Sequence, residues 1–235
     1  LPYYFLLGVL GYTVYHLALN FGQTQVSAGA ASLIIATAPA ITALLAVFMT
    51  GERLPALGWL GSLVSFAGVA LIVVGDSGAG VRFNAYAWLI VVAAVATSLY
   101  AIMQRRMFAR YRPIEVAAFA TWAGTVPMLA FAPGVVADVA AASPAPLLAT
   151  LYIGVFPSAV AYTIFAFDLS RAPVTLVTAA LYLVPVFSLL ASWLLVSEVP
   201  GLLTALVGSV AIGGVVLLNL AKQRQARRVA AAPAD

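Results

Sequence analysis

The sequence predicts an all-α integral membrane protein, a polytopic helical bundle of two inverted-topology repeats. Two observations carry this prediction. Of the 235 residues, 64% are hydrophobic and only 8% are charged, whereas soluble proteins average about 25% charged residues. In addition, Pro39 and Glu52 recur as Pro185 and Glu198, each 146 positions later. A repeat with a fixed offset indicates a duplicated domain.

Eight apolar stretches are long enough to cross a membrane, since a spanning helix needs about 20 mostly apolar residues. Short connectors rich in Gly, Pro, Asp and Arg separate them and mark turns at the membrane interfaces. We therefore expect eight helices, at residues 2–21, 25–48, 55–75, 84–104, 114–132, 146–167, 174–196 and 201–221.

The connectors set the ends of these helices in chain order. A charged hairpin at 51–53 separates the second helix from the third, and the segment 75–78 (GDSG) ends the third. The fourth helix ends in the basic segment 104–112, and a turn at 142–144 precedes the sixth. The eighth helix continues into a basic tail at 222–228.

The basic residues predict the orientation. Threading eight helices from a cytoplasmic first residue places ten Lys and Arg residues on one side and only Arg82 on the other. By the positive-inside rule the first side is the cytoplasm, so the C-terminus is expected to be cytoplasmic. Glu52 and Glu198 then lie on opposite sides of the membrane, so the two copies are expected to have opposite orientations. Inverted repeats are typical of secondary transporters.

The offset also divides the chain. We expect the second part of an N-terminal repeat, with three helices, at 1–76, a C-terminal repeat of five helices at 84–221, and a basic cytoplasmic tail at 222–235. Because the first repeat holds fewer helices than the second, two more helices are expected before Leu1. The full protein is then predicted to have ten.

The repeated pattern also resembles a known family. It reads P-x₄-L-x₇-E at Pro39–Glu52 and at Pro185–Glu198, and Gly-Val pairs follow at 68–69 and 214–215. This resembles the EamA-type branch of the drug/metabolite transporter superfamily over the whole chain. The resemblance implies a ten-helix exporter or permease of the bacterial inner membrane. Its cavity would be walled by the family's third, fourth, sixth, eighth and ninth helices, which here start at Pro2, Gln25, Asn84, Pro146 and Val174.

His16, the only histidine, lies deep in the first apolar stretch, where an ionisable side chain suggests function. Tyr12 and Asn20 share its helix face at a spacing of four residues. We expect this face to line a substrate cavity, and His16 could carry a transported proton. A neutral imidazole bonded to a neighbouring helix is the alternative. Tyr162 lies 146 positions after His16, at the equivalent position of the second copy. This correspondence favours a position that lines the cavity in both copies.

Other hydroxyl-bearing side chains are candidates for the same cavity, which would combine aromatic faces with few polar groups. Ordinary packing between helices is the alternative for each of them. These candidates are Tyr100, Ser158, Tyr162, Thr178 and Tyr182.

The repeated prolines and acids have separate interpretations. Pro39 and Pro185 lie inside apolar stretches, where a proline removes a backbone hydrogen bond and kinks a helix. Because they are related by the repeat, we interpret them as gating hinges; a purely structural kink is the alternative. Glu52 and Glu198 lie at interfacial hairpins, where each is expected to cap the positive end of the following helix.

These features favour a secondary active transporter of small metabolites, such as amino acids or drug-like amphipathic compounds. No G-x-x-x-x-G-K-[ST] motif is present, so ATP is not the expected driver, and proton coupling is favoured. No acidic or basic residue lies in the middle of an apolar stretch, which favours a neutral or zwitterionic solute. Two alternatives are a non-transporting scaffold or channel and, least favoured, an intramembrane hydrolase, because G-x-S-x-G is absent.

The remaining expectations concern cofactors and partners. The chain has no cysteine and one histidine, so we expect no metal site, no cofactor and no catalytic residue. Its basic residues cluster at the ends of apolar stretches, which argues against a nucleic-acid partner. The expected partners are a small-molecule substrate and membrane lipids. Both a monomer and a homodimer remain possible.

Overall fold

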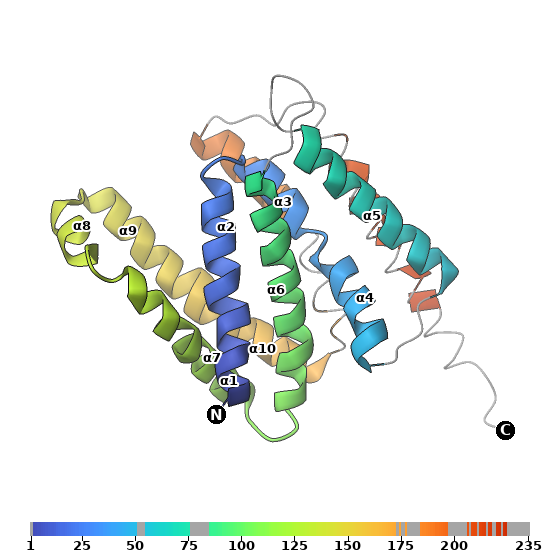
Figure 1. The fold of residues 1–235 in the computed structure, drawn as a ribbon, viewed down its shortest axis with the longest axis horizontal. Coiled ribbons are helices and arrows are strands. Elements are labelled where there is room, and N and C mark those ends of the chain that lie inside the picture. The colour runs from blue at the N-terminus through green and yellow to red at the C-terminus, as the bar shows by residue number, and fades with distance from the viewer. Residues whose placement is uncertain are drawn as a thin grey trace. The chain divides into compact units, whose positions relative to one another are not determined.

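The computed structural model describes residues 2–50, 55–75, 85–172 and 184–196, with scattered positions between 174 and 224. Within these ranges every regular element is helical (Figure 1), which confirms the all-α fold. The π-helices η1, η3 and η5 and the short 3₁₀ helix η2 interrupt or extend α-helices. In chain order the elements are α1 (Pro2–Gly8), η1 (Val9–Val14), α2 (Tyr15–Gln23), α3 (Ala28–Ile35), α4 (Ala38–Thr50), α5 (Ala56–Gly75), α6 (Ala85–Met107), α7 (Pro113–Met128), η2 (Leu129–Phe131), α8 (Val135–Ala141), α9 (Pro144–Ile153), η3 (Gly154–Ala161), α10 (Tyr162–Arg171), α12 (Val184–Ala191) and η5 (Ser192–Val196).

Five helical segments among the described residues are long and apolar enough to cross a membrane. They match five of the expected helices, and α5 matches the third. The seventh is described in part, as α12 and η5, and about half of the eighth lies outside the described residues. The chain is therefore a multi-pass membrane protein. The five segments are Pro2–Gln23, Ala28–Met49, Ala85–Met107, Pro113–Phe131 and Pro144–Arg171.

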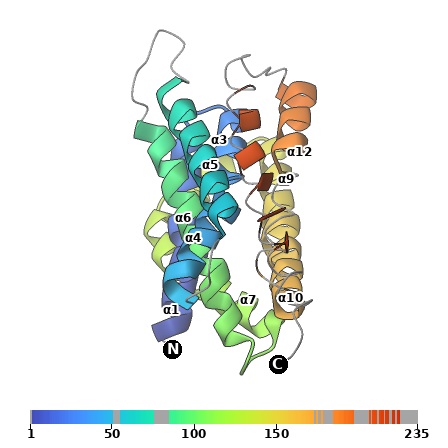
Figure 2. The same ribbon diagram turned by 90° about the vertical axis from the view of Figure 1, so that its right-hand side faces the viewer.

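The chain forms two compact units. The first comprises residues 1–14 and 100–177, and the second comprises residues 15–99 and 178–235. In the first unit, α9, η3 and α10 continue one another as a single rod (Figure 2).

Two glycines bring α1 and α7 together in the first unit. A Cβ atom added to Gly8 would lie 2.5 Å from the Gly124 amide nitrogen and 2.8 Å from the Ala123 Cβ. The Thr13 hydroxyl donates to the Gly124 carbonyl oxygen at 2.6 Å, and both groups are buried. Helices in lipid associate through such close backbone approach, because apolar side chains gain nothing by leaving apolar solvent. This contact holds η1 against α7.

The start of α7 is fixed by local chemistry. Pro113 occupies its first turn, where the missing N–H costs nothing. The Glu115 carboxylate accepts the Arg112 backbone N–H at 2.9 Å, so it satisfies a backbone donor at the start of the helix. At the other side of the connector, α6 ends in Arg105 and Arg106, whose charges favour the negative end of the helix dipole.

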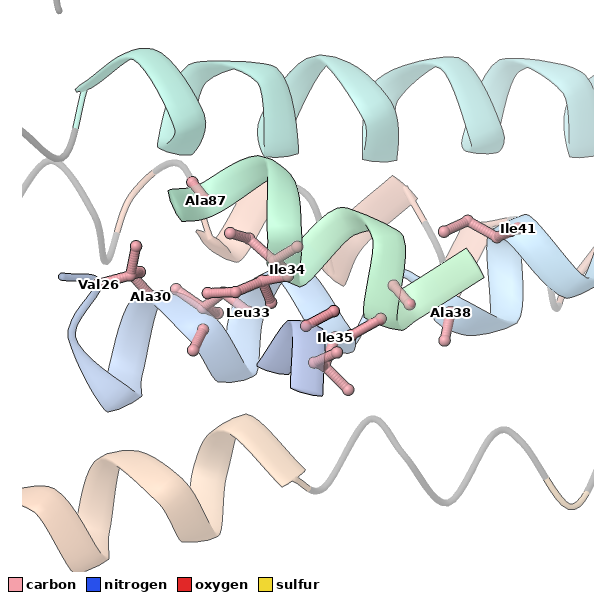
Figure 3. Close-up of a cluster of buried hydrophobic side chains, with 13 residues drawn as sticks. Val26, Ala30, Leu33, Ile34, Ile35, Ala38, Ile41 and Ala87 are labelled. Atoms are coloured by element: carbon pink, nitrogen blue, oxygen red, sulfur yellow. The ribbon is translucent and has the colours of Figure 1, made fainter. Parts of the chain in front are cut away.

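The second unit is organised around an apolar cluster from α2, α3, α4 and α6 (Figure 3). Small side chains dominate it and let the helices approach closely. Gly22 lies against the Ile90 side chain, where a Cβ would be 2.5 Å from its Cγ1. The buried members are Ala18, Val26, Ala30, Ala31, Leu33, Ile34, Ile35, Ala38, Ile41, Ala87, Ile90, Ala93 and Ala94.

The second spanning segment is not one continuous α-helix. It breaks at Ala36 and Thr37, between α3 and α4, and Pro39 is the second residue of α4. The Ser98 hydroxyl of α6 donates to the Ala38 carbonyl oxygen at 3.0 Å. A side chain of another helix thus contacts the backbone at the break.

Candidate functional site

Three tyrosines from three helices form an aromatic cluster in the first unit, hereafter the tyrosine cluster. The rings of Tyr12 in η1 and Tyr162 in α10 are stacked, with centroids 4.6 Å apart and an interplanar angle of 29°. Tyr100 in α6 meets Tyr12 edge-on at 5.9 Å and Tyr162 at 6.2 Å. Tyr12 and Tyr100 are buried, and Tyr162 is half-buried. Tyr12 lies near the middle of its 22-residue spanning helix.

Neutral polar groups of the described residues contact this cluster. The Tyr162 hydroxyl donates to the Gly11 carbonyl oxygen at 3.4 Å. The Thr121 side chain of α7 lies close to the Tyr12 hydroxyl. Gly11 lies directly under the Tyr100 ring, since an added Cβ would be 2.7 Å from ring atoms. Aromatic faces with a few hydroxyls and a backbone carbonyl suit a neutral or zwitterionic solute.

The helices that carry Tyr12 and Tyr162 each contain a π-helix at the same place. Shifting η1 (Val9–Val14) by the repeat offset of 146 gives residues 155–160, which lie inside η3 (Gly154–Ala161). Tyr12 lies in η1, and Tyr162 directly follows η3. Single π turns are rare and occur mostly at functional sites. Their occurrence at equivalent positions therefore indicates a functional region in both halves of the chain.

The sequence explains why the α-helix changes to a π-helix at η1 and η3. Gly11 and Pro157 occupy the same position in the two copies, and both are poor helix residues. Pro157 has no N–H to give to the Ile153 carbonyl four residues earlier, and its ring crowds that carbonyl. The Ser158 hydroxyl donates to the Ile153 oxygen at 3.1 Å. Ser158, predicted to line the cavity, thus supplies a hydrogen bond beside the proline.

The other candidates of the first helix belong to the second unit. His16 lies in α2, is half-buried, and its ring meets the Tyr15 ring edge-on at 5.0 Å. Asn20 is exposed. Burial thus decreases along the face on which the sequence places Tyr12, His16 and Asn20.

The structure locates the two prolines as follows. Pro39 is buried in the first turn of α4, just after the break at Ala36 and Thr37. Pro185 lies in α12. Four further predicted residues lie outside the described residues: Glu52, Thr178, Tyr182 and Glu198.

A separate apolar groove of about 480 Å³ lies between α1, α7 and Tyr111 in the first unit. Its lining is almost entirely hydrocarbon and largely exposed, with Trp122 77% exposed. It offers no set of polar groups to orient a metabolite, so its chemistry suits lipid chains. Among the residues that the structure describes, no three acidic or histidine side chains gather to offer a metal ion a ligand set.

Two contributors to the tyrosine cluster, Gly11 and Thr121, were not expected from the sequence. Gly11 directly precedes Tyr12 and aligns with Pro157, so the repeat could have indicated it. Thr121 lies on α7, which the resemblance did not include among the cavity helices.

Comparisons with known proteins agree with this fold. The EamA-like transporter family matches residues 1–74 and 84–220. A "Probable terminal-alkyne amino-acid exporter" of Streptantibioticus cattleyicolor is 38% identical over 229 residues, which cover 96% of this chain and 76% of that protein. "Uncharacterized transporter YdfC" of Bacillus subtilis is 38% identical over 215 residues, 92% of this chain and 70% of that protein.

A solved crystal structure shares the fold, with a TM-score of 0.62 at 23% sequence identity over 94% of this chain and 77% of that one. The two relatives at 38% identity carry the names of transporters, not of enzymes. The family match covers nearly the whole chain in two segments. This chain belongs to the EamA-like transporter family.

Proposed function

We propose that this protein is a secondary active transporter of the bacterial plasma membrane that exports small neutral or zwitterionic metabolites, amino acids with an apolar side chain foremost. The observation that carries the proposal is the tyrosine cluster. It places three aromatic rings and several neutral polar groups within one buried region that includes the middle of a spanning helix.

The substrate class follows from the chemistry of these groups. Tyrosine faces bind apolar groups and attract cations such as an ammonium, while the Gly11 carbonyl, Thr121 and the hydroxyls supply hydrogen bonds. A relative is named as a probable exporter of a terminal-alkyne amino acid. A small apolar side chain of that kind would pack on the aromatic rings.

Transport would proceed by alternating access between the two repeats, which we propose to be inverted in the membrane with the C-terminus in the cytoplasm. Pro39 and Pro185, at equivalent positions, would act as hinges. The break at Ala36 and Thr37, directly before Pro39, supports such a role, because hinges commonly lie at the ends of elements.

The energy source would be the proton gradient, with His16 as the group that binds the proton. It is the chain's only histidine, and it is half-buried in a spanning segment. An imidazole can change its charge near neutral pH, which a proton-coupled carrier requires.

Uptake into everted membrane vesicles tests this function. A panel of labelled amino acids that includes L-propargylglycine, a terminal-alkyne amino acid, would be offered with and without an imposed pH gradient. We expect saturable, gradient-driven uptake of at least one member. Tyr12→Ala should reduce it more than tenfold, and Tyr152→Ala, on the exposed face of α9, should not.

The His16→Ala substitution distinguishes a role in proton coupling from a role in moving the substrate. It should abolish the response to the pH gradient while exchange between labelled and unlabelled substrate continues. A gradient response that survives this substitution would remove His16 from the coupling role. If the native protein takes up no member of the panel, the proposed substrate class is wrong.

A further inference from the structure

Gln104 in α6 is completely buried, and neither its carbonyl oxygen nor its amide nitrogen has a hydrogen-bond partner among the described residues. Buried polar groups are nearly always hydrogen-bonded, because burying one without a partner costs free energy. A side chain of similar size without polar atoms, such as methionine, would avoid this cost. Gln104 therefore points to a partner that the described residues do not supply.

The position of Gln104 relates it to the tyrosine cluster. It follows Tyr100 by four residues in a regular α-helix, so both lie on the same face, about 6 Å apart along the axis. The Tyr3 hydroxyl donates to the carbonyl oxygen of Met103 at 3.0 Å, so α1 crosses α6 at this level. Gln104 thus lies one turn beyond the cluster, toward the basic end of α6.

We propose that Gln104 is a specificity-determining residue of the transport site and that it contacts the polar head group of the substrate. This inference rests on the proposed function. A carboxamide offers one acceptor oxygen and two N–H donors. It is matched by the head group of a zwitterionic amino acid, whose carboxylate accepts from the amide nitrogen while its ammonium donates to the amide oxygen.

This arrangement divides recognition between two levels of the site. The tyrosine rings contact the apolar side chain of the substrate, and Gln104 contacts its head group. A site built to hydrogen-bond a polar group discriminates strongly against an analogue that lacks the group, because the buried partner is then left unpaired. The native protein should therefore reject the decarboxylated analogue of its substrate.

Gln104→Met in the full protein tests the proposal through two independent measurements. The first is thermal unfolding of the purified protein in detergent. Removing an unpartnered buried amide should leave the melting temperature unchanged or raise it by about 2–4 °C. The second is vesicle uptake of the amino acid that the native protein transports. The KM of the variant should rise at least tenfold while its maximal rate changes much less.

Competition adds a readout of specificity. For L-propargylglycine as labelled substrate, but-3-yn-1-amine is the analogue without the carboxylate. It should compete poorly with uptake by the native protein and markedly better in Gln104→Met. Gln104→Asn, which keeps the amide but shortens the side chain, should fall between the two. Gln23→Met, at an exposed glutamine of α2, is the matched control and should behave like the native protein.

Three results would overturn the inference. A fall of several degrees in the melting temperature of Gln104→Met would reveal a structural hydrogen bond. An unchanged KM and unchanged competition would show that substrate does not contact Gln104, while native uptake would still support the transporter. Absence of native uptake of every amino acid tested would remove the proposed substrate class and the role of Gln104 with it.

Discussion

The hydroxyl of Tyr162 in α10 donates a hydrogen bond to the carbonyl oxygen of Gly11 in η1, although 151 positions separate the two residues in the chain. This bond joins a side chain of one half of the sequence to the backbone of a π-helix in the other half. The stacked rings of Tyr12 and Tyr162 lie beside it. The two sequence halves thus meet directly at the tyrosine cluster.

Replacing Tyr162 with phenylalanine tests this contact. The ring and its stacking on Tyr12 remain, but the donor to Gly11 is lost, which costs about 1 kcal/mol for a typical hydrogen bond. We expect a fivefold rise in KM with little change in protein yield, measured by vesicle uptake. Tyr152→Phe on α9 is the control, because its side chain is 60% exposed. Native KM in Tyr162→Phe would contradict a role for this hydroxyl.

Gly8→Ala should weaken the contact between α1 and α7. The new methyl group would lie 2.5 Å from the Gly124 nitrogen, so the helices must separate, at a cost of about 1–3 kcal/mol. Thermal unfolding should show a clearly lower melting temperature. Gly154 is its equivalent in the second copy, and no atom of the described residues lies within 4 Å of a Cβ added there. Gly154→Ala should therefore be neutral or slightly stabilising, and equal effects at both glycines would refute this explanation.

Thr13→Val should destabilise the same contact in a different way. It keeps the shape of the side chain but removes the buried donor to the Gly124 carbonyl. The expected loss is about 1 kcal/mol, or 2–4 °C in melting temperature. Thr150→Val serves as the comparison, since Thr150 is exposed and its hydroxyl donates to the Pro146 carbonyl oxygen of its own helix. Similar shifts in both variants would argue against the interhelical bond.

Pro157→Ala should convert η3 toward a regular α-helix. Alanine restores an N–H for the Ile153 carbonyl and has a better helix propensity by about 3 kcal/mol. We expect an equal or higher melting temperature together with several-fold slower uptake, because Tyr162 at the end of η3 would be displaced. Pro144→Ala, at the start of α9 where proline is tolerated, should leave uptake unchanged. Unaltered uptake in Pro157→Ala would show that the π-helix is dispensable.

Much of the fold could be predicted from the sequence, because membrane-spanning helices have a strong signature in length and composition. Five of the expected helices appear as spanning segments, with ends that differ by a few residues. The sequence did not predict that the helix would break at Ala36 and Thr37. Proline marks the region, but the position of a break also depends on contacts such as that of Ser98 with the Ala38 carbonyl.

The site was predicted only in part. Tyr12, Tyr100 and Tyr162 were all expected to line a cavity, and the structure brings them together. Periodicity shows which residues share a face of one helix, but it does not show which helix lies opposite. Thr121 was missed for that reason. The spacing of Tyr12 and His16 was read as α-helical, whereas η1 widens the turn that carries Tyr12.

The paired π-helices have a mechanical consequence. An α-helix held by i→i−4 bonds resists twisting about its own axis, but a π segment stores one surplus residue that can be released or taken up by exchanging i→i−5 bonds for i→i−4 bonds. Such an exchange rotates one end of a spanning helix against the other while nearly all backbone hydrogen bonds persist. An unpaired backbone group is costly within the lipid bilayer. We therefore expect η1 and η3 to be the places where the helices carrying Tyr12 and Tyr162 can rotate while their backbone stays hydrogen-bonded.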